Sequence, residues 1–217
     1  MNISHFFPLA TILTVGSASA AVNIIDQTYG VGAGSFDLGL YSQNSGNPGN
    51  YMRLTSGSTT ITGWTVGGAQ GVDWQTAPSN PAQNGLYSVD LSGISTVPSI
   101  GSVTTTIPTA IGTEYLISFY TYGGVEVLPG HLTAGTLDQF FSSPGNPNPE
   151  VPSFTKFEYS FTALDTLTAI TFSSTPVSYG FGPVIDNVVV TIPEPSSGLL
   201  GLSGLLGLSL RRRRPQK

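Results

Sequence analysis

Few residue types in this chain could carry covalent catalysis. The sequence contains no cysteine, and His131 is the one histidine beyond the first twenty residues. A Ser-His-Asp arrangement would depend on His131, which stands in the turn-like stretch Pro129-Gly130-His131, where a structural role is commoner. Eleven acidic residues between positions 21 and 192 would allow a glycosidase-like carboxylate pair, but nothing in their spacing selects one.

Aromatic residues give ligand binding more support than catalysis. An aromatic ring can stack on a sugar ring while amides and hydroxyls orient the ligand. Trp64 is flanked by β-branched residues, which favours a core position, whereas Trp74 precedes a loop and fits a core or a surface position equally well. We therefore expect a ligand site in one loop-rich region, formed by Trp74, Asp73, Tyr87 and Asn84.

The charge of the central region narrows the choice of partner. Between positions 21 and 192 the eleven acids face two cationic residues, Arg53 and Lys156, which gives a formal charge of −9. A domain of this charge repels nucleic acid and anionic membranes and can attract divalent cations. A neutral polysaccharide is the ligand class that fits best, bound through aromatic and uncharged polar groups.

The first twenty residues resemble a secretory signal peptide. Residues 6–16 are mostly apolar, and Ala18-Ser19-Ala20 is a small-x-small site, which predicts cleavage after Ala20. The alternative is a structural helix, against which Pro8 argues. We expect residues 1–20 to be removed and the protein to be exported across the inner membrane.

The last 25 residues have the features of a targeting signal. Pro193-Glu194-Pro195 is followed by an apolar run over 199–210 and by Arg211, Arg212, Arg213 and Arg214. The run is about 18 Å long as a helix at roughly 1.5 Å per residue, short of the roughly 30 Å membrane core. The arginines would hold their end in the cytoplasm. The alternative is a buried helix, which would need a large core around it.

This order of features resembles the PEP-CTERM sorting signal of Gram-negative bacteria. The resemblance implies transient membrane insertion of residues 193–217, recognition by a membrane-embedded exosortase, and removal of the tail. It also implies delivery to the cell surface or extracellular matrix.

Residues 21–192 predict one all-β domain. Gly, Thr, Ser, Val and aromatic residues dominate, no sustained helical period occurs, and alternating apolar and polar positions recur between turn residues. Many short strands of this kind are typical of an antiparallel sandwich. The expected strands are 35–40, 59–66, 72–74, 86–91, 102–108, 114–122, 156–162, 167–173 and 184–192.

Several short motifs along this domain together are similar to the choice-of-anchor C family. They include Ser35-Phe36-Asp37, Gly71-Val72-Asp73-Trp74, Gly85-Leu86-Tyr87 and Gly182-Pro183-Val184-Ile185-Asp186-Asn187. That family is related to the galactose-binding-like domains of plant cell-wall proteins, and the resemblance implies a jelly-roll β-sandwich. The proline-rich middle, residues 122–154, departs from the family pattern where a regular strand pair should lie.

The resemblance also implies a structural calcium ion shared by Asp37 and Asp186. Calcium takes several oxygen ligands that a fold brings together from distant positions. The alternative is that Asp186 and Asn187 take backbone hydrogen bonds at a turn.

These observations support three functions. The first is a non-catalytic surface or matrix protein with a carbohydrate-binding domain. The second is a structural component of the extracellular polymer matrix without a specific ligand. The third, with the least support, is a glycan hydrolase. An exposed aromatic row beside polar groups would favour the first, and two convergent carboxylates in a cleft would favour the third.

Overall fold

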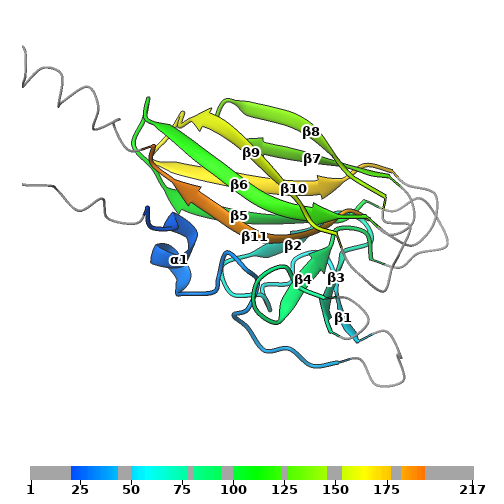
Figure 1. The fold of residues 1–217 in the computed structure, drawn as a ribbon. Helices are drawn as coiled ribbons and strands as arrows, with labels where there is room; N and C mark the ends of the chain where they lie inside the picture. The colour runs from blue at the N-terminus through cyan, green and yellow to red at the C-terminus, as the bar shows by residue number, and fades with distance from the viewer. Residues whose placement is uncertain are drawn as a thin grey trace, which may run out of the picture.

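The computed structural model describes residues 21–43, 50–77, 81–93, 100–123, 127–145, 153–176 and 182–193. These residues form one short helix, α1 (Ile24–Tyr29), and eleven strands (Figure 1). The strands are β1 (Tyr51–Leu54), β2 (Thr65–Gly67), β3 (Val72–Thr76), β4 (Tyr87–Asp90), β5 (Ser102–Pro108), β6 (Glu114–Tyr122), β7 (Leu128–Ala134), β8 (Leu137–Ser143), β9 (Thr155–Thr162), β10 (Leu167–Ser174) and β11 (Val184–Thr191).

The strands form two antiparallel sheets that pack face to face. One sheet has the order β1-β3-β4-β11-β6-β9, and the other has the order β2-β5-β10-β7-β8. The last eight strands are divided so that β4, β11, β6 and β9 lie side by side in one sheet and β5, β10, β7 and β8 in the other. This arrangement is the jelly-roll topology. The predicted all-β jelly-roll sandwich is therefore confirmed.

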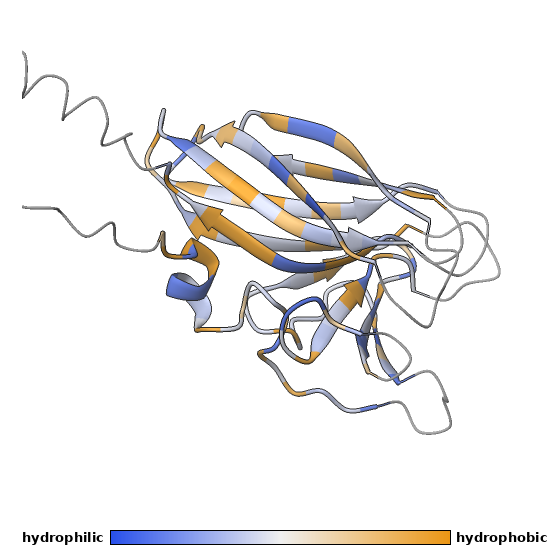
Figure 2. Ribbon diagram, viewed as in Figure 1, coloured by the Kyte–Doolittle hydropathy of each residue, from blue (hydrophilic) through white to orange (hydrophobic). Residues whose placement is uncertain are grey.

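Alternation of residue type explains which side chains the sandwich buries. Along β6, Tyr115, Ile117 and Phe119 are buried while the residues between them are partly exposed. Orange and blue segments alternate along several strands, as the two faces of a half-buried strand require (Figure 2). The strand 114–122 was predicted to be central because both of its faces are apolar, and it lies between β11 and β9.

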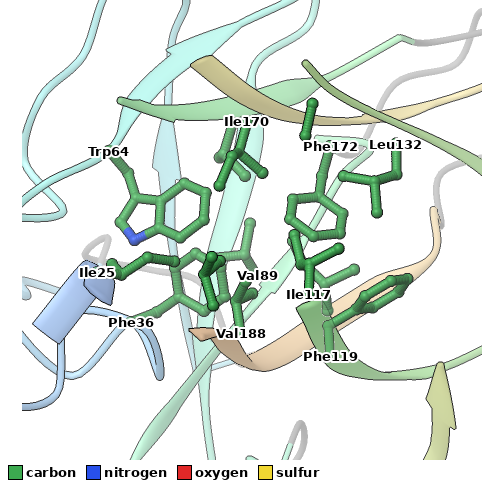
Figure 3. Packing of buried hydrophobic residues seen from close by; sticks show 14 of the residues in the cluster. Ile25, Phe36, Trp64, Val89, Ile117, Phe119, Leu132, Ile170, Phe172 and Val188 are labelled. Carbon is green, nitrogen blue, oxygen red and sulfur yellow. The ribbon is translucent and has the colours of Figure 1, made fainter. Parts of the chain in front are cut away.

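Large side chains from both sheets fill the core. The rings of Phe119 on β6 and Phe172 on β10 lie 4.8 Å apart and join the two sheets. At the other end of the core, Trp64 and Phe36 lie 4.8 Å apart beside Ile25 of α1 (Figure 3). Burial of each such side chain contributes about 1.5–3 kcal/mol to stability. The predicted core position of Trp64 is confirmed, since the residue is 2% exposed.

The start of the domain is fastened to its last strand. The Asn23 side chain caps α1 by accepting from the Ile25 N–H at 3.2 Å. The same side-chain oxygen accepts from the Val190 N–H at 3.0 Å, and its amide donates to the Val188 carbonyl at 3.0 Å. This capping asparagine, which the sequence analysis did not single out, therefore joins a helix end to β11.

Three sequence predictions about the elements are wrong. Residues 35–40 were expected to form a strand, but residues 31–36 form turns, and Phe36 has a φ of 57° that no strand allows. Only Thr65 and Val66 of the predicted strand 59–66 lie in a strand of a sheet, β2. The proline-rich middle was expected to lack a regular strand pair, yet β7 and β8 pair over their whole length there.

Candidate functional site

Asp186 fastens a loop to the final strand. A bulge interrupts β11 between Asp186 and Val189, where Asn187 has a φ of 48°. Bulges re-aim neighbouring side chains, and here the Asp186 carboxylate meets the chain just before β4. Its Oδ2 accepts from the Gln83 N–H at 2.6 Å and from the Asn84 N–H at 2.9 Å. Its Oδ1 accepts from the Asn187 N–H at 2.6 Å.

Asp37 fastens the following residues of the same loop. Its Oδ1 accepts from the backbone N–H groups of Leu86, at 2.7 Å, and Tyr87, at 3.2 Å. Its Oδ2 accepts from the Ser35 hydroxyl at 2.9 Å. Gly85 lies between the two clamped pairs with a φ of 76°, and a Cβ there would lie 1.7 Å from Asp37 Oδ2. The loop can therefore sit on the carboxylate only with glycine at this position.

The charge of Asp37 acts on the buried carboxyl of Asp186. Asp186 is fully buried, and burial, together with the charge of Asp37, raises its pKa to about 7 against the lowering effect of the three N–H groups. Both carboxylates accept hydrogen bonds from the backbone of residues 83–87, so the fold brings Asp37 and Asp186 to the same loop.

This arrangement does not fit a calcium ion. Calcium takes six to eight oxygen ligands, whereas Asp37 Oδ1 and Asp186 Oδ2 each face two N–H donors. Within the residues that the structure describes, no group of three or more His, Cys, Asp or Glu side chains is placed to hold a metal. The carboxylates act here as a loop clamp, and calcium binding at this pair stays a prediction.

Trp74 lies beneath the clamped loop and not on the surface. The residue is 0% exposed, and its indole Nε1–H donates to the Phe36 carbonyl at 3.1 Å. The expectation that Trp74 stacks on a sugar ring is therefore corrected, because no face of the indole reaches solvent. Its position on the inner face of β3, opposite Val89 of β4, assigns it to the core.

Asp73 is also unsuitable as a direct ligand contact. Its neighbour Trp74 points into the core, so Asp73 lies on the outer face of the same sheet, where it is 1% exposed. Arg53 on β1 binds both carboxylate oxygens, at 2.9 and 3.1 Å. On the neighbouring strand β4, Asp90 lies opposite Asp73 in the strand register. Asp90 is fully buried, and burial is the main cause that raises its pKa well above the usual range. The expectation that Asp73 and Trp74 act at one site is therefore corrected.

The other two predicted residues stay accessible, and they have a neighbour that the sequence analysis missed. Tyr87 is partly exposed and packs against Tyr41, with ring centroids 4.7 Å apart and ring planes tilted by 30°. Both rings rest on Trp74, at 4.9 Å and 5.2 Å. Asn84 is exposed in the clamped loop, and Leu86 is 66% exposed beside Tyr87. The aromatic group thus has a buried base, Trp74, and a partly exposed top formed by Tyr41 and Tyr87. We call Tyr41 and Tyr87 the tyrosine pair.

Comparison with known proteins places the domain in a family. Residues 31–191, well over half of the chain, match the family described as a protein of unknown function (DUF642). The chain belongs to the DUF642 family. Residues 191–214 match the PEP-CTERM protein-sorting motif, so the predicted sorting signal is confirmed.

Other similarities of the DUF642 domain are more distant. Halomucin from Haloquadratum walsbyi (strain DSM 16790 / HBSQ001) is 33% identical over 189 residues, which are 84% of this chain and 2% of that protein's length. The solved structure of TmCBM61 in complex with β-1,4-galactotriose has 18% identity and a TM-score of 0.47 over 70% of this chain and 100% of that chain. A family 35 carbohydrate binding module from Clostridium thermocellum has 12% identity and a TM-score of 0.42 over 65% of this chain and 99% of that chain.

Both predicted targeting segments fall outside the described part of the DUF642 protein. Signal-peptide residues Ala18 and Ala20 lie there, and so do Glu194, Pro195 and Arg211 to Arg214 of the sorting motif. Pro193 is the last residue described and is exposed. In the described ranges no helix is long and apolar enough to cross a membrane.

Proposed function

We propose that the DUF642 domain is a non-catalytic glycan-binding module, displayed at the surface or in the extracellular matrix of a Gram-negative bacterium. The sorting motif at residues 191–214 indicates export and surface sorting. An exosortase would be the partner that removes the tail. In this proposal a signal peptide over residues 1–20 begins the export, and the resemblance to the choice-of-anchor C family would describe the mode of surface display.

The tyrosine pair is the observation that carries the glycan-binding proposal. Tyr41 and Tyr87 present partly exposed rings that their contacts with the buried Trp74 hold in place. Rings that are ordered before binding lose little entropy when a sugar stacks on them. The exposed Asn84 supplies an amide that can donate to and accept from sugar hydroxyls.

Charge supports a neutral ligand at the tyrosine pair. The two carboxylates nearest the loop, Asp37 and Asp186, accept hydrogen bonds from backbone N–H groups. In the described residues the basic side chains are Arg53, which binds Asp73, and Lys156, which lies 3.0 Å from Glu158. Uronic-acid chains would meet no free cation there, whereas neutral sugars need none.

Polysaccharide pull-down tests this proposal. The full chain in mild detergent is mixed with a panel of neutral polysaccharides, and the bound fraction is compared for wild type, Tyr41→Ala and Tyr87→Ala. Loss of one stacking ring should weaken binding roughly tenfold, because stacking contributes about 1–2 kcal/mol. Tyr159→Ala is the matched control, since Tyr159 is also a partly exposed tyrosine but lies on β9.

Three outcomes would count against the proposal. If folded Tyr87→Ala protein binds as well as wild type, the tyrosine pair is not the glycan-binding site. If wild type binds no glycan in the panel, the structural matrix protein becomes the better interpretation. Release of reducing sugar from any substrate would favour the hydrolase instead.

A further inference from the structure

The five-stranded sheet carries a straight row of threonines on its outer face. The strand registers place Thr65, Thr104, Thr171 and Thr133 opposite one another across β2, β5, β10 and β7. Asp138 of β8 ends this row beside Thr133. Four consecutive strands therefore present the same hydroxyl-bearing side chain at the same level.

A second row runs parallel to the first. It contains Ser102, Ser173, His131 and Phe140, one from each of β5, β10, β7 and β8. The two rows are two residues apart along every strand, so they lie about 7 Å apart, with about 4.8 Å between neighbouring strands. We call the two rows together the hydroxyl face.

The residues between the rows show that the hydroxyl face points outward. Val66, Val103, Phe172 and Leu132 occupy the intervening positions on the same four strands and are 0–2% exposed. Alternation then requires both rows to lie on the opposite side of the sheet. Thr65, Asp138 and Phe140 are exposed, and the other members of the rows are partly exposed.

The hydroxyl face is ordered before any ligand arrives. Threonine is stiff at χ1, and the hydroxyls of Thr104 and Thr171 lie 2.9 Å apart in a cross-strand hydrogen bond. Phe140 stacks on His131 with ring centroids 4.5 Å apart, and His131 Nε2 lies 2.6 Å from Asp138 Oδ1. These contacts fix the ring and the rows that a ligand would meet.

Phe140 has an unusual position for its type. It is 62% exposed, and in the part of the chain that the structure describes every other aromatic side chain is buried or only partly exposed. Its position on β8, at one edge of the sheet, places an apolar ring at the end of a hydroxyl row. An exposed ring beside ordered hydroxyls is the chemistry that recognises a sugar ring.

We propose that the hydroxyl face binds the flat surface of a neutral, ordered polysaccharide in which extended chains lie side by side. The two rows carry a single acid, Asp138, which lies 2.6 Å from His131 Nε2, so the face carries at most one negative charge, whereas residues 21–192 have a formal charge of −9. A second copy of this chain is a poorer fit, because a stable protein interface needs an apolar centre and this face has hydroxyls there.

The hydroxyl face and the tyrosine pair would meet different forms of a glycan. A face that spans four strands is wide enough to contact several chains that lie side by side, whereas two rings at a loop match one chain. This inference rests on the proposed glycan-binding role but not on the tyrosine pair, which belongs to the other sheet and its loops. Each surface can therefore be tested with the other intact.

A matched pair of arginine variants tests the inference. Ser173→Arg places a bulky cation in the middle of the hydroxyl face, and Ser160→Arg makes the same change on β9, an exposed position of the other sheet. Depletion isotherms are measured with the full chain on microcrystalline cellulose and on crystalline chitin. We expect Ser173→Arg to weaken binding at least tenfold on the solid that wild type binds, and Ser160→Arg to bind like wild type.

A second variant and a soluble probe separate the possible results. Phe140→Ala should also weaken binding to the solid, and neither face variant should change the binding of soluble oligosaccharides from the same polymers. If folded Ser173→Arg and Phe140→Ala bind the solid as wild type does, the hydroxyl face is not a binding surface. If Tyr87→Ala alone abolishes binding, the proposed function stands and this inference fails. If wild type binds neither solid, the inference is overturned whatever the oligosaccharides do.

Discussion

At the scale of single residues, the pKa of Asp186 gives a testable dependence of stability on pH. Its pKa rises from an ordinary value of 3.8 to about 7 in the folded protein, mainly because the carboxyl is buried. The folded state therefore binds more protons than the unfolded state between these values. The free energy of unfolding should fall as the pH rises from about 4 to 7, by at most about 1.4 kcal/mol per pH unit from this group.

The Asp186→Asn variant isolates that contribution. Its side-chain oxygen can still accept from the Gln83 and Asn84 N–H groups, but the side chain no longer titrates. Chemical denaturation at a series of pH values should show a shallower decline for the variant than for wild type. Equal slopes would mean that Asp186 ionises normally.

The same titration tests the calcium site predicted from the sequence. A bound cation would hold Asp186 ionised, so the folded pKa would fall below 3.8 and the slope would change sign. Because N–H donors face the carboxylates, we expect the wild-type curve to be the same with EDTA and with calcium. A stabilisation by calcium that EDTA removes would establish the metal instead.

At the scale of elements, the clamped loop depends on Gly85. An alanine there would adopt a φ of 76° and place its Cβ 1.7 Å from Asp37 Oδ2. Gly57 is the matched control, since its φ is 87° and a Cβ would meet nothing within 4 Å. Both alanine variants should lose about 1–2 kcal/mol for the left-handed backbone.

Gly85→Ala should lose about 1–3 kcal/mol more than Gly57→Ala, because the loop and the carboxylate must separate. Urea denaturation gives the difference, and polysaccharide pull-down should show weaker binding for Gly85→Ala alone. Equal stability of the two variants would show that the loop can move off Asp37 without cost, and the clamp would then have no energetic role.

The same elements show how far the sequence can predict this fold. Strands β5, β6, β9 and β10 were predictable because more buried and less buried positions alternate along each over at least seven residues, and β11 was predictable from its run of β-branched residues. Strand β8 was not, because it is an edge strand with four of its seven residues exposed, so no clear period marks it. Strand β7 was hidden by Pro129 and Gly130, residues that usually indicate a turn.

The candidate site was predictable only in part for a related reason. The acids Asp37 and Asp186 were predicted to meet, but their N–H partners depend on the conformation of residues 83–87. Trp74 was assigned to the surface as readily as to the core because the sequence next to it suits both. Tyr41 was missed because it follows a turn region with no period, and only the fold brings it to Tyr87.

At the scale of the whole molecule, charge is divided between two regions with different tasks. The sandwich holds eleven acids and two cationic residues, while the region beyond Pro193 holds four arginines and Lys217 against one acid, Glu194. A strongly acidic domain does not adhere to an anionic membrane surface, whereas a basic end stays on the cytoplasmic side. The division suits a domain that leaves the cell while its tail is held for processing.

The sorting motif gives the last prediction. Replacing Arg211–Arg214 with serine should leave the sandwich folded but remove the charge that fixes the orientation of the tail. The sorting motif lies at residues 191–214, and the proposed exosortase would remove the tail. In wild type, mass spectrometry of surface-released protein should therefore find chains that end before Arg211. The serine variant should accumulate with an intact Lys217 end in the membrane fraction or the periplasm.

Lys217→Ser controls for the loss of one positive charge outside the arginine block and should be processed normally. Wild-type surface protein that still ends in Lys217 would show that the tail is an anchor and is not removed.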